Sequence, residues 1–409
     1  MVNLPSRGPR SPTISPQLIA GDSTAEVSWE RAREIASSLV GVGGTELVGL
    51  DQADNRTLAL DHKALVDLPS FDNSAMDGWA VCGEGPWTVT RELIAGEFPT
   101  WQLVKGQASS IATGAPVPAG TTAILRSEHG EINGDQLTST REPTQDIRHK
   151  GEECRTGDLM LTAGTRLTPS AIGVLAATGH DRLTVRIQPT VHLLVFGDEL
   201  IFEGIPPQGK IRDSLGPQLP GWLNRMGAVI SQVTHCSDSL TEVLETLTNV
   251  TTDIVITTGG TASGPRDFLR AVLQELKATM YIDGVHVRPG HPMMLATVPN
   301  VRGSSTPVIG LPGNPLSAVV GLLTLAQPII NSFLGLPQRD LEKLITTNDL
   351  YSKNGTRLIA GTAQSGEFAV SEFNGSAMLR GLSQSTGFAV IESDTVAGST
   401  VKYLSLPHI

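Results

Sequence analysis

Residues 189–200 read PTVHLLVFGDEL, an apolar run at 191–196 that ends directly at Gly197, Asp198 and Glu199. Further apolar runs follow at regular intervals: VISQV at 229–233, DIVITT at 253–258, MYIDGVHV at 280–287 and PVIGL at 307–311. The segments between them are helix-like, as in PRDFLRAVLQELK, where Pro265 occupies a position that a helix start tolerates. This alternation predicts a mostly parallel sheet covered by helices on both faces, a three-layer α/β domain over residues 188–336.

The segments on either side of this domain differ from it in the spacing of their apolar residues. Residues 26–50 contain SWERAREIASSLV, with Ser28 as N-cap and apolar residues at helical spacing. Residues 51–144 alternate short runs such as WAVC and TAILRS with Gly and Pro turns, which predicts an inserted β lobe. We expect 26–50 and 145–187 to form one mixed N-terminal domain around it, and the alternating runs of 337–409 to form a small β domain. Residues 1–25 are expected to be a flexible tail.

Composition excludes several classes of protein. The 409 residues carry a net charge of −11, so no positive field favours nucleic acid or anionic lipid. Only three cysteines occur, without a CxxC pair, so neither disulfides nor a zinc site is expected and a reducing cytoplasm fits best. The most apolar stretch, 316–330, is interrupted by Gly321, Gln327 and Pro328 and predicts no membrane span.

The loops after the predicted parallel strands are where such a sheet binds its ligands. Asp198 and Glu199 follow the first strand, where they could hold a metal or form a solvated turn. TTGGTASG at 257–264 lets backbone amides approach a phosphate, and Ser263 adds a hydroxyl. Asp267 lies in the first turn of the next helix, where capping that helix is the alternative to binding a ligand.

The next two loops continue this pattern. Arg288-Pro289-Gly290-His291-Pro292 places two cationic residue types on a stiff turn, which indicates an anion site or a solvated Arg beside a packing His. LPGNPLS at 311–317 is a rigid turn entering a helix, with an amide and a hydroxyl available. Taken alone, the residues predict an anionic ligand held by an α/β domain.

Seven motifs together resemble the molybdopterin molybdenumtransferase family, bacterial relatives of the gephyrin E domain. In order along the chain they are PSFDNSAMDGWAV at 69–81, ATGAPVPAG at 112–120, KGEE at 150–153, GDEL at 197–200, TTGG at 257–260, RPGHP at 288–292 and LPGNPLSA at 311–318. Any one is weak, whereas seven in this order from about residue 26 to the C-terminus are specific.

The resemblance implies four subdomains, the last of them a C-terminal β-barrel, and elongated homodimers whose clefts lie between the α/β domain of one subunit and the N-terminal lobes of the other. It implies a reaction in which adenylylated molybdopterin and molybdate are the substrates, Mg²⁺ assists, and AMP leaves. A molybdopterin adenylyltransferase or recipient molybdoenzymes are the further partners it implies.

The same resemblance assigns roles by motif match. Asp77 and Thr113 would belong to the lobe facing the partner subunit. Glu199 and Asp267 would belong to the acidic, metal-associated set, and all four are the expected catalytic residues. The expected cofactor-binding residues are Gly259, Gly260, Ser263, Arg288, His291, Pro312, Gly313, Asn314 and Pro315.

Departures from the family pattern are concentrated in these loops. Val195-Phe196 replaces a usual pair of hydroxyl residues, Arg288 and His291 replace two lysines, and Leu215 replaces an Asn. Thr261, Ala262, Pro265 and Glu153 also differ from the usual residues. Three alternatives therefore stand: an active transferase with an altered site, a non-catalytic paralogue that binds molybdopterin as carrier or scaffold, and an adenylyltransferase-like enzyme that uses the α/β domain alone.

Overall fold

A computed structural model describes residues 26–237, 239–261, 268–301, 303–338 and 340–407. The chain divides into two compact units. The first contains the described residues up to Val48, residues 55–59 and the described residues from Thr184 onward; the second contains residues 49–54 and 60–183. Each unit is described by itself.

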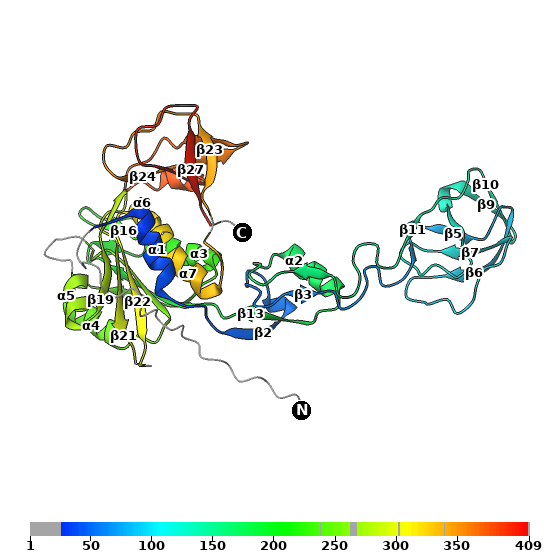
Figure 1. Ribbon diagram of the computed structural model, residues 1–409, viewed down its shortest axis with the longest axis horizontal. Helices are drawn as coiled ribbons and strands as arrows, with labels where there is room; N and C mark the ends of the chain where they lie inside the picture. Colours follow the sequence, from blue (N-terminus) through cyan, green and yellow to red (C-terminus); the bar gives the residue numbers. More distant parts are fainter. Residues whose placement is uncertain (1–25, 238, 262–267, 302, 339, 408–409) are drawn as a thin grey trace. The chain divides into compact units, whose positions relative to one another are not determined.

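A six-stranded sheet forms the centre of the first unit, in the order β17-β14-β18-β22-β21-β19 (Figure 1). The bounds are Val229–Cys236 for β17, Thr190–Phe196 for β14, Ile254–Thr258 for β18, Ser305–Leu311 for β22, Met294–Pro299 for β21 and Thr279–Asp283 for β19. The first four strands are mutually parallel, which confirms the predicted mostly parallel sheet. Strand β21 runs antiparallel to both of its neighbours, and the sequence reasoning did not anticipate it.

Helices cover both faces of this sheet because successive apolar side chains along each strand point to opposite faces. Leu193 and Val195 of β14 pack on one side with helices α3 (Leu215–Met226), α6 (Pro315–Gly321) and α7 (Gln327–Leu334). Leu194 packs on the other side with α4 (Leu240–Thr248) and α5 (Phe268–Glu275). The three-layer architecture follows from this period of two.

Helix α1 (Trp29–Leu39) belongs to the core of the α/β domain. The predicted cap is present, because the Ser28 hydroxyl accepts a hydrogen bond from the Arg31 amide at 3.2 Å. The indole of Trp29 is 1% exposed and donates to the Thr324 hydroxyl at 3.0 Å. The expectation that residues 26–50 would join 145–187 differs from the observed packing for α1, whose apolar stripe is covered by α7 and the helix before it. Strand β2 (Thr45–Gly49) does pair with β13 (Arg182–Arg186), as that grouping requires.

One long helix has a length and composition that would also suit a membrane span. It runs over Pro315–Leu334 as α6, the π-helical turn η4 (Leu322–Ala326) and α7. Its most apolar window is 83% buried inside the protein. It is the central helix of the α/β core, since its residues pack with α1, α3 and the sheet.

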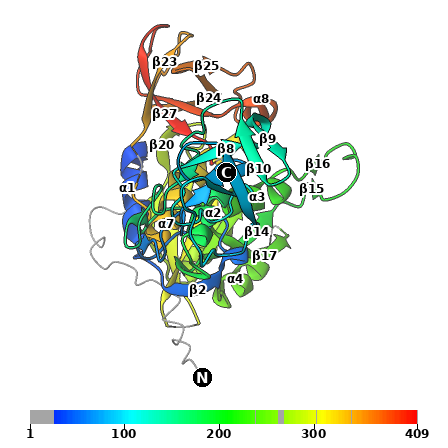
Figure 2. The same cartoon turned by 90° about the vertical axis from the view of Figure 1, so that its right-hand side faces the viewer.

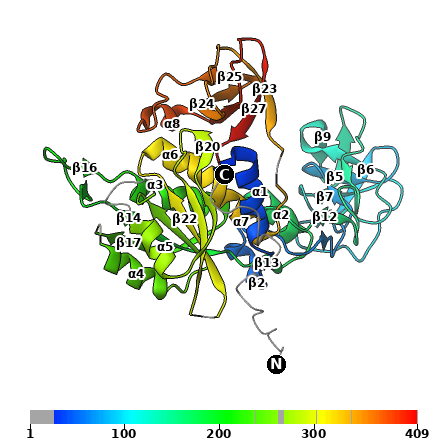
Figure 3. The ribbon, with the colours of Figure 1, turned by 60° about the vertical axis from the view of Figure 1, so that its left-hand side comes forward.

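The C-terminal region forms a closed β-barrel within the first unit (Figure 3). Its strands are β23 (Glu342–Thr346), β24 (Thr356–Gln364), β25 (Glu367–Val370), β26 (Gly387–Ile391) and β27 (Thr400–Ser405). Pairing of β24 with β26 closes the ring. Strand β20 (Val285–Arg288), expected from its sequence to lie in the α/β sheet, instead pairs with β24 and extends the barrel sheet.

The second unit contains the β lobe. Six strands make its sheet in the order β8-β5-β7-β6-β10-β9. Their bounds are Ala123–Arg126, Gly78–Val81, Gln107–Ile111, Trp87–Leu93, Gln136–Ser139 and Gly130–Asn133, respectively. Helix α2 (Pro169–Ala177), capped by Thr168, lies in the segment that follows the lobe in the sequence. The predicted runs WAVC and TAILRS therefore lie in strands of one sheet. Two other short strands of 51–144, β3 (His62–Lys63) and β4 (Asn73–Ser74), pair instead with β12 (Leu159–Leu161) and β11 (Ile147–Arg148).

Candidate active site

Three loops meet at one edge of the α/β sheet because the strands before them are parallel neighbours. Val195 of β14 lies opposite Thr258 of β18, and Thr258 lies opposite Leu311 of β22. The loops that follow, GDE, GG and PGNP, therefore start side by side, as expected for the carboxyl edge of a parallel sheet. Together they line a cavity of about 430 Å³, whose wall also includes Ile211–Leu215 and Ala377.

Backbone forms much of this cavity's wall. Gly259 and Gly260 have left-handed conformations, with φ values of 85° and 71°. The Gly259 amide donates to the Leu311 carbonyl at 2.8 Å, and a Cβ on Gly313 would lie only 3.8 Å from the Gly259 Cα. Such a surface allows a phosphate to approach main-chain amides closely. Asn314 and Pro315 line the same cavity, so the structure brings these five predicted residues together; their binding role stays a prediction.

Two carboxylates line the cavity as well. Glu199 is exposed, its side chain folds back toward Gly197, and its carboxylate makes no hydrogen bond to any residue that the structure describes. Asp213 is 6% exposed and accepts hydrogen bonds from the amides of Leu215 and Gly216 at 2.9 and 3.0 Å. Asp213 was missed as a site residue, although an Asp before an amphipathic helix is a recognisable cap signal.

This donor set fits a hard divalent cation only in part. Carboxylate oxygens are the ligands that Mg²⁺ accepts, and Glu199 offers both of its oxygens. Within the described ranges, no group of three or more His, Cys, Asp or Glu side chains forms a metal cluster. Asp267 and Ser263, two of the predicted site residues, lie outside the described residues. A cation here would therefore keep several water or phosphate ligands.

Phe196 changes the surface of the glycine loop. It is the last residue of β14 and lines the cavity where a hydroxyl residue was expected from the family pattern. Its ring lies on the backbone of Gly260: a Cβ at that position would be 3.1 Å from Cδ2 of the ring. Loss of the hydroxyl is thus accompanied by a new apolar contact with the loop.

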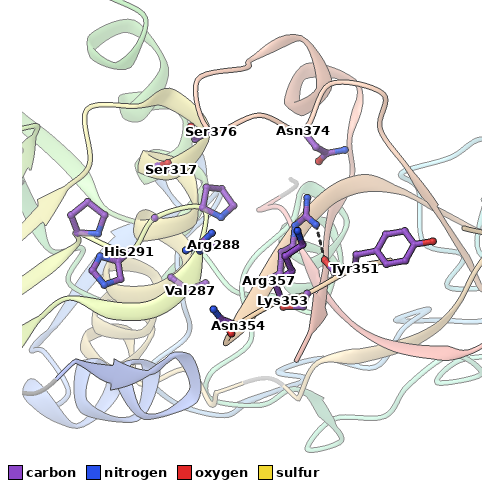
Figure 4. A pocket seen from close by; sticks show the side chains of 14 residues that line it. Val287, Arg288, His291, Ser317, Tyr351, Lys353, Asn354, Arg357, Asn374 and Ser376 are labelled. Atoms are coloured by element: carbon purple, nitrogen blue, oxygen red, sulfur yellow. Dashed lines mark hydrogen bonds between the residues drawn. The ribbon is translucent and has the colours of Figure 1, made fainter. Parts of the chain in front are cut away.

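A second cavity, of about 520 Å³, adjoins the first and is rich in cations (Figure 4). The residues that line it come from the β20 end and its loop, from the start of α6 and from the barrel: 287–292, Ser317, Tyr351–Asn354, Arg357, Asn374 and Ser376. None of these described lining residues carries a carboxylate. The Ser376 carbonyl accepts from the amides of Leu316 and Ser317 at 3.0 and 3.3 Å, so the start of α6 and the 376–377 segment lie between the two cavities.

Arg288 and His291, predicted to face an anion, line this second cavity rather than the first. Their loop lines a different cavity from the glycine loop because β20, the strand before it, pairs with β24 of the barrel and not with the α/β sheet. The His291 Nε2 atom lies 2.7 Å from one oxygen of Glu26, and His286 Nδ1 lies 3.1 Å from the other. A proton on His291 is therefore offset by the Glu26 carboxylate.

The remaining predicted residues fall into two places. Pro312 is buried directly after β22, where it stiffens the PGNP turn. Asp77 and Thr113 lie in the second unit and contact each other: the Thr113 amide donates to Asp77 Oδ1 at 2.7 Å. This backbone hydrogen bond is the main reason that the pKa of Asp77 is lowered from its ordinary value, so its carboxylate stays ionised.

Comparisons with known proteins agree with this arrangement. Residues 27–179 match the model of the MoeA N-terminal region (domain I and II), and residues 192–332 match a probable molybdopterin binding domain. A molybdopterin molybdenumtransferase from Nostoc sp. is 34% identical over 308 residues, covering 71% of this chain and 70% of that protein. Another from Haemophilus influenzae is 33% identical, covering 72% and 74%, respectively.

A solved structure extends the likeness to almost the whole fold. The molybdopterin biosynthesis protein moeA of Pyrococcus horikoshii superposes with a TM-score of 0.72, covering 93% of this chain and 99% of that one. At 24% sequence identity this likeness concerns the fold alone. It includes both the α/β domain and the C-terminal barrel.

Proposed function

This chain belongs to the molybdopterin molybdenumtransferase family, and we propose that it inserts molybdate into adenylylated molybdopterin with release of AMP. The reaction cleaves the phosphoanhydride of the adenylylated substrate and places molybdenum on the dithiolene. It requires a cradle for phosphates beside a pocket for a small oxyanion. The adjoining glycine-lined and cationic cavities are the observation that carries the proposal.

The first cavity would hold the phosphates. The 259–260 turn and the rigid 313–315 turn line the same space. The Gly259 amide is already bonded to the Leu311 carbonyl, so the amides of Gly260, Gly313 and Asn314 are the proposed donors to an anion. Preorganised amides of this kind stabilise charge without a reorganisation penalty at the moment of reaction. Mg²⁺ held by Glu199, with Asp267 as the second predicted ligand, would supply neutralisation of charge on the anhydride.

The second cavity would hold molybdate. Arg288 and Arg357 both line it, and the described lining offers hydroxyl and amide groups from Ser317 and Asn374 but no competing negative charge. The two substrates would then be held on either side of the Ser376 segment. Proximity and orientation of this kind can lower the activation free energy by several kcal/mol, about 7–11 in the best cases.

The alternatives differ in what supports them. The curated relatives carry the transferase name, and no finding favours a non-catalytic carrier. The match to the N-terminal region of MoeA over 27–179 is unexpected for an adenylyltransferase that uses the α/β domain alone. We therefore retain the transferase, and we propose that it works in the cytoplasm as a homodimer, which light scattering of the purified protein would test.

The decisive experiment measures AMP released from adenylylated molybdopterin by purified protein with Mg²⁺, with and without molybdate. Release that depends on molybdate is the expected result. Tight binding of the nucleotide without any release would instead identify a carrier. Glu199→Gln is the matched inactive control, because it removes the charge of one exposed side chain in the first cavity and should abolish AMP release without altering the fold.

A further inference from the structure

The barrel contributes a cation to the second cavity through one tight turn. Lys353 lies on this turn, between Tyr351 and Gly355, and lines the cavity beside Arg357 (Figure 4). The turn is firmly held: the Ser352 hydroxyl donates to the Gly355 carbonyl, and the Ser352 amide donates to Asp394 Oδ1, both at 2.8 Å. The backbone position of Lys353 is therefore fixed, even though its side chain is exposed.

The same turn packs directly on strand β20. Gly355 has φ +70°, and a Cβ there would lie 3.1 Å from the backbone carbonyl of His286. This close approach sets the turn against the strand that ends at Arg288. Lys353 and Arg288, which are more than sixty residues apart in the sequence, thus line the same cavity.

Like charges are concentrated here, and none of the described residues that line the cavity is a carboxylate. Arg288 of β20 and Arg357 of β24 are register partners on neighbouring parallel strands. One nitrogen of Arg357 donates to the Tyr351 carbonyl at 2.6 Å, which leaves the positive charge itself unneutralised. Like charges side by side on neighbouring strands destabilise a sheet, and a bound anion would reverse that effect.

We propose that Lys353 is a direct ligand of the molybdate oxyanion in this cavity and that it supplies the positive charge that His291, paired with Glu26, does not. The proposal rests on the proposed function for the identity of the anion. A lysine ammonium suits this task because it is a compact point charge with three donors, which a tetrahedral oxyanion can accept in several orientations. Lys353 would thereby set the affinity for molybdate in this chain.

The test compares Lys353→Met with Lys343→Met, an exposed barrel lysine on β23 that does not line the cavity. We expect Lys353→Met to raise KM for molybdate about tenfold, about 1.4 kcal/mol, with kcat unchanged. Direct titration of the protein with molybdate by calorimetry should show the same loss of affinity. Lys343→Met should match the wild type in both measurements.

A second variant separates charge compensation from a structural effect. Adding His291→Lys together with Glu26→Gln to Lys353→Met should restore most of the lost affinity, because the new ammonium then enters the same cavity without a carboxylate partner. Equal molybdate KM and Kd in Lys353→Met and wild type would overturn the proposal, and so would a loss confined to kcat. If the wild type binds molybdate through Lys353 yet releases no AMP, the proposed function fails while this inference stands.

Discussion

Gly259 and Gly260 provide a matched pair for testing how the glycine loop is built. Both have left-handed φ values, so an alanine at either position costs about 1–2 kcal/mol of backbone strain. They differ in surroundings: among the described residues, a Cβ at 259 would have no neighbour closer than 3.9 Å, whereas at 260 it would lie 3.1 and 3.3 Å from two atoms of the Phe196 ring. Only Gly260→Ala must also move an aromatic side chain.

Displacing that ring from its rotamer adds about 0.5–1.5 kcal/mol. We therefore expect Gly260→Ala to destabilise the α/β core more than Gly259→Ala by this amount, or by about 1–6 °C in Tm at roughly 2–4 °C per kcal/mol. Hydrogen exchange of the β18 amides reports the stability of the element that carries both substitutions. Calorimetry of the full chain provides the Tm.

A double-mutant cycle with Phe196→Ala isolates the contact. In the Phe196→Ala background, the difference between the two glycine substitutions should disappear, because the added Cβ at 260 then keeps only an ordinary van der Waals contact, with the Leu269 Cβ at 3.5 Å. Equal destabilisation by Gly259→Ala and Gly260→Ala in the wild-type background would refute the reasoning. It would mean that Phe196 does not rest on the loop as the structure shows it.

Three further predictions concern individual carboxylates. Glu199→Gln should abolish molybdate-dependent AMP release while leaving Tm unchanged, since the side chain is exposed; wild-type turnover would remove Glu199 from the site. Asp77→Asn should lower AMP release equally from about pH 5 to pH 9 without moving the acid limb, because the folded pKa lies below the ordinary value of about 3.9. Its ionised form stabilises the fold above the unfolded pKa, and that contribution is lost as pH falls through the folded pKa, so wild type and variant should converge in acid denaturation only below about pH 4. Asp213→Ala should cost about 0.5–2 kcal/mol by uncapping α3, measured by urea denaturation; no loss would show that the two amide contacts are not stabilising.

Sequence patterns predicted the parallel strands well because each is an apolar run ending in a distinctive loop. The run at 191–196 and the loop at Gly197 are read directly from neighbouring residues, and the strands confirm them. Strand β21 escaped notice because an antiparallel strand at the sheet's far side carries no loop motif. Helix α1 was grouped with the wrong segment because an apolar stripe predicts burial without naming the partner surface.

The candidate site was predictable only where its residues share a motif. Gly259 and Asn314 belong to such motifs, and the sheet register brings them together. Asp213 and Lys353 are single residues in ordinary sequence, and their positions depend on a cap and on a barrel turn. No local sequence pattern indicates that β20 pairs with the barrel and not with the α/β sheet. The position of Arg288 in a different cavity from the glycine loop could therefore not be predicted.

The ribbon of β15 (Leu200–Ile201) and β16 (Ile211–Arg212) projects from the α/β domain between Glu199 and Asp213 (Figure 2). Its tip is far more accessible than its base, with Ile205 93% exposed. Glu199 and Asp213, the two carboxylates of the first cavity, thus lie directly before and directly after the two strands at the base of this ribbon. Insertions or deletions at the tip could accumulate over evolution without altering their spacing, whereas a shift of one residue in the pairing of Leu200 with Ile211 would separate them.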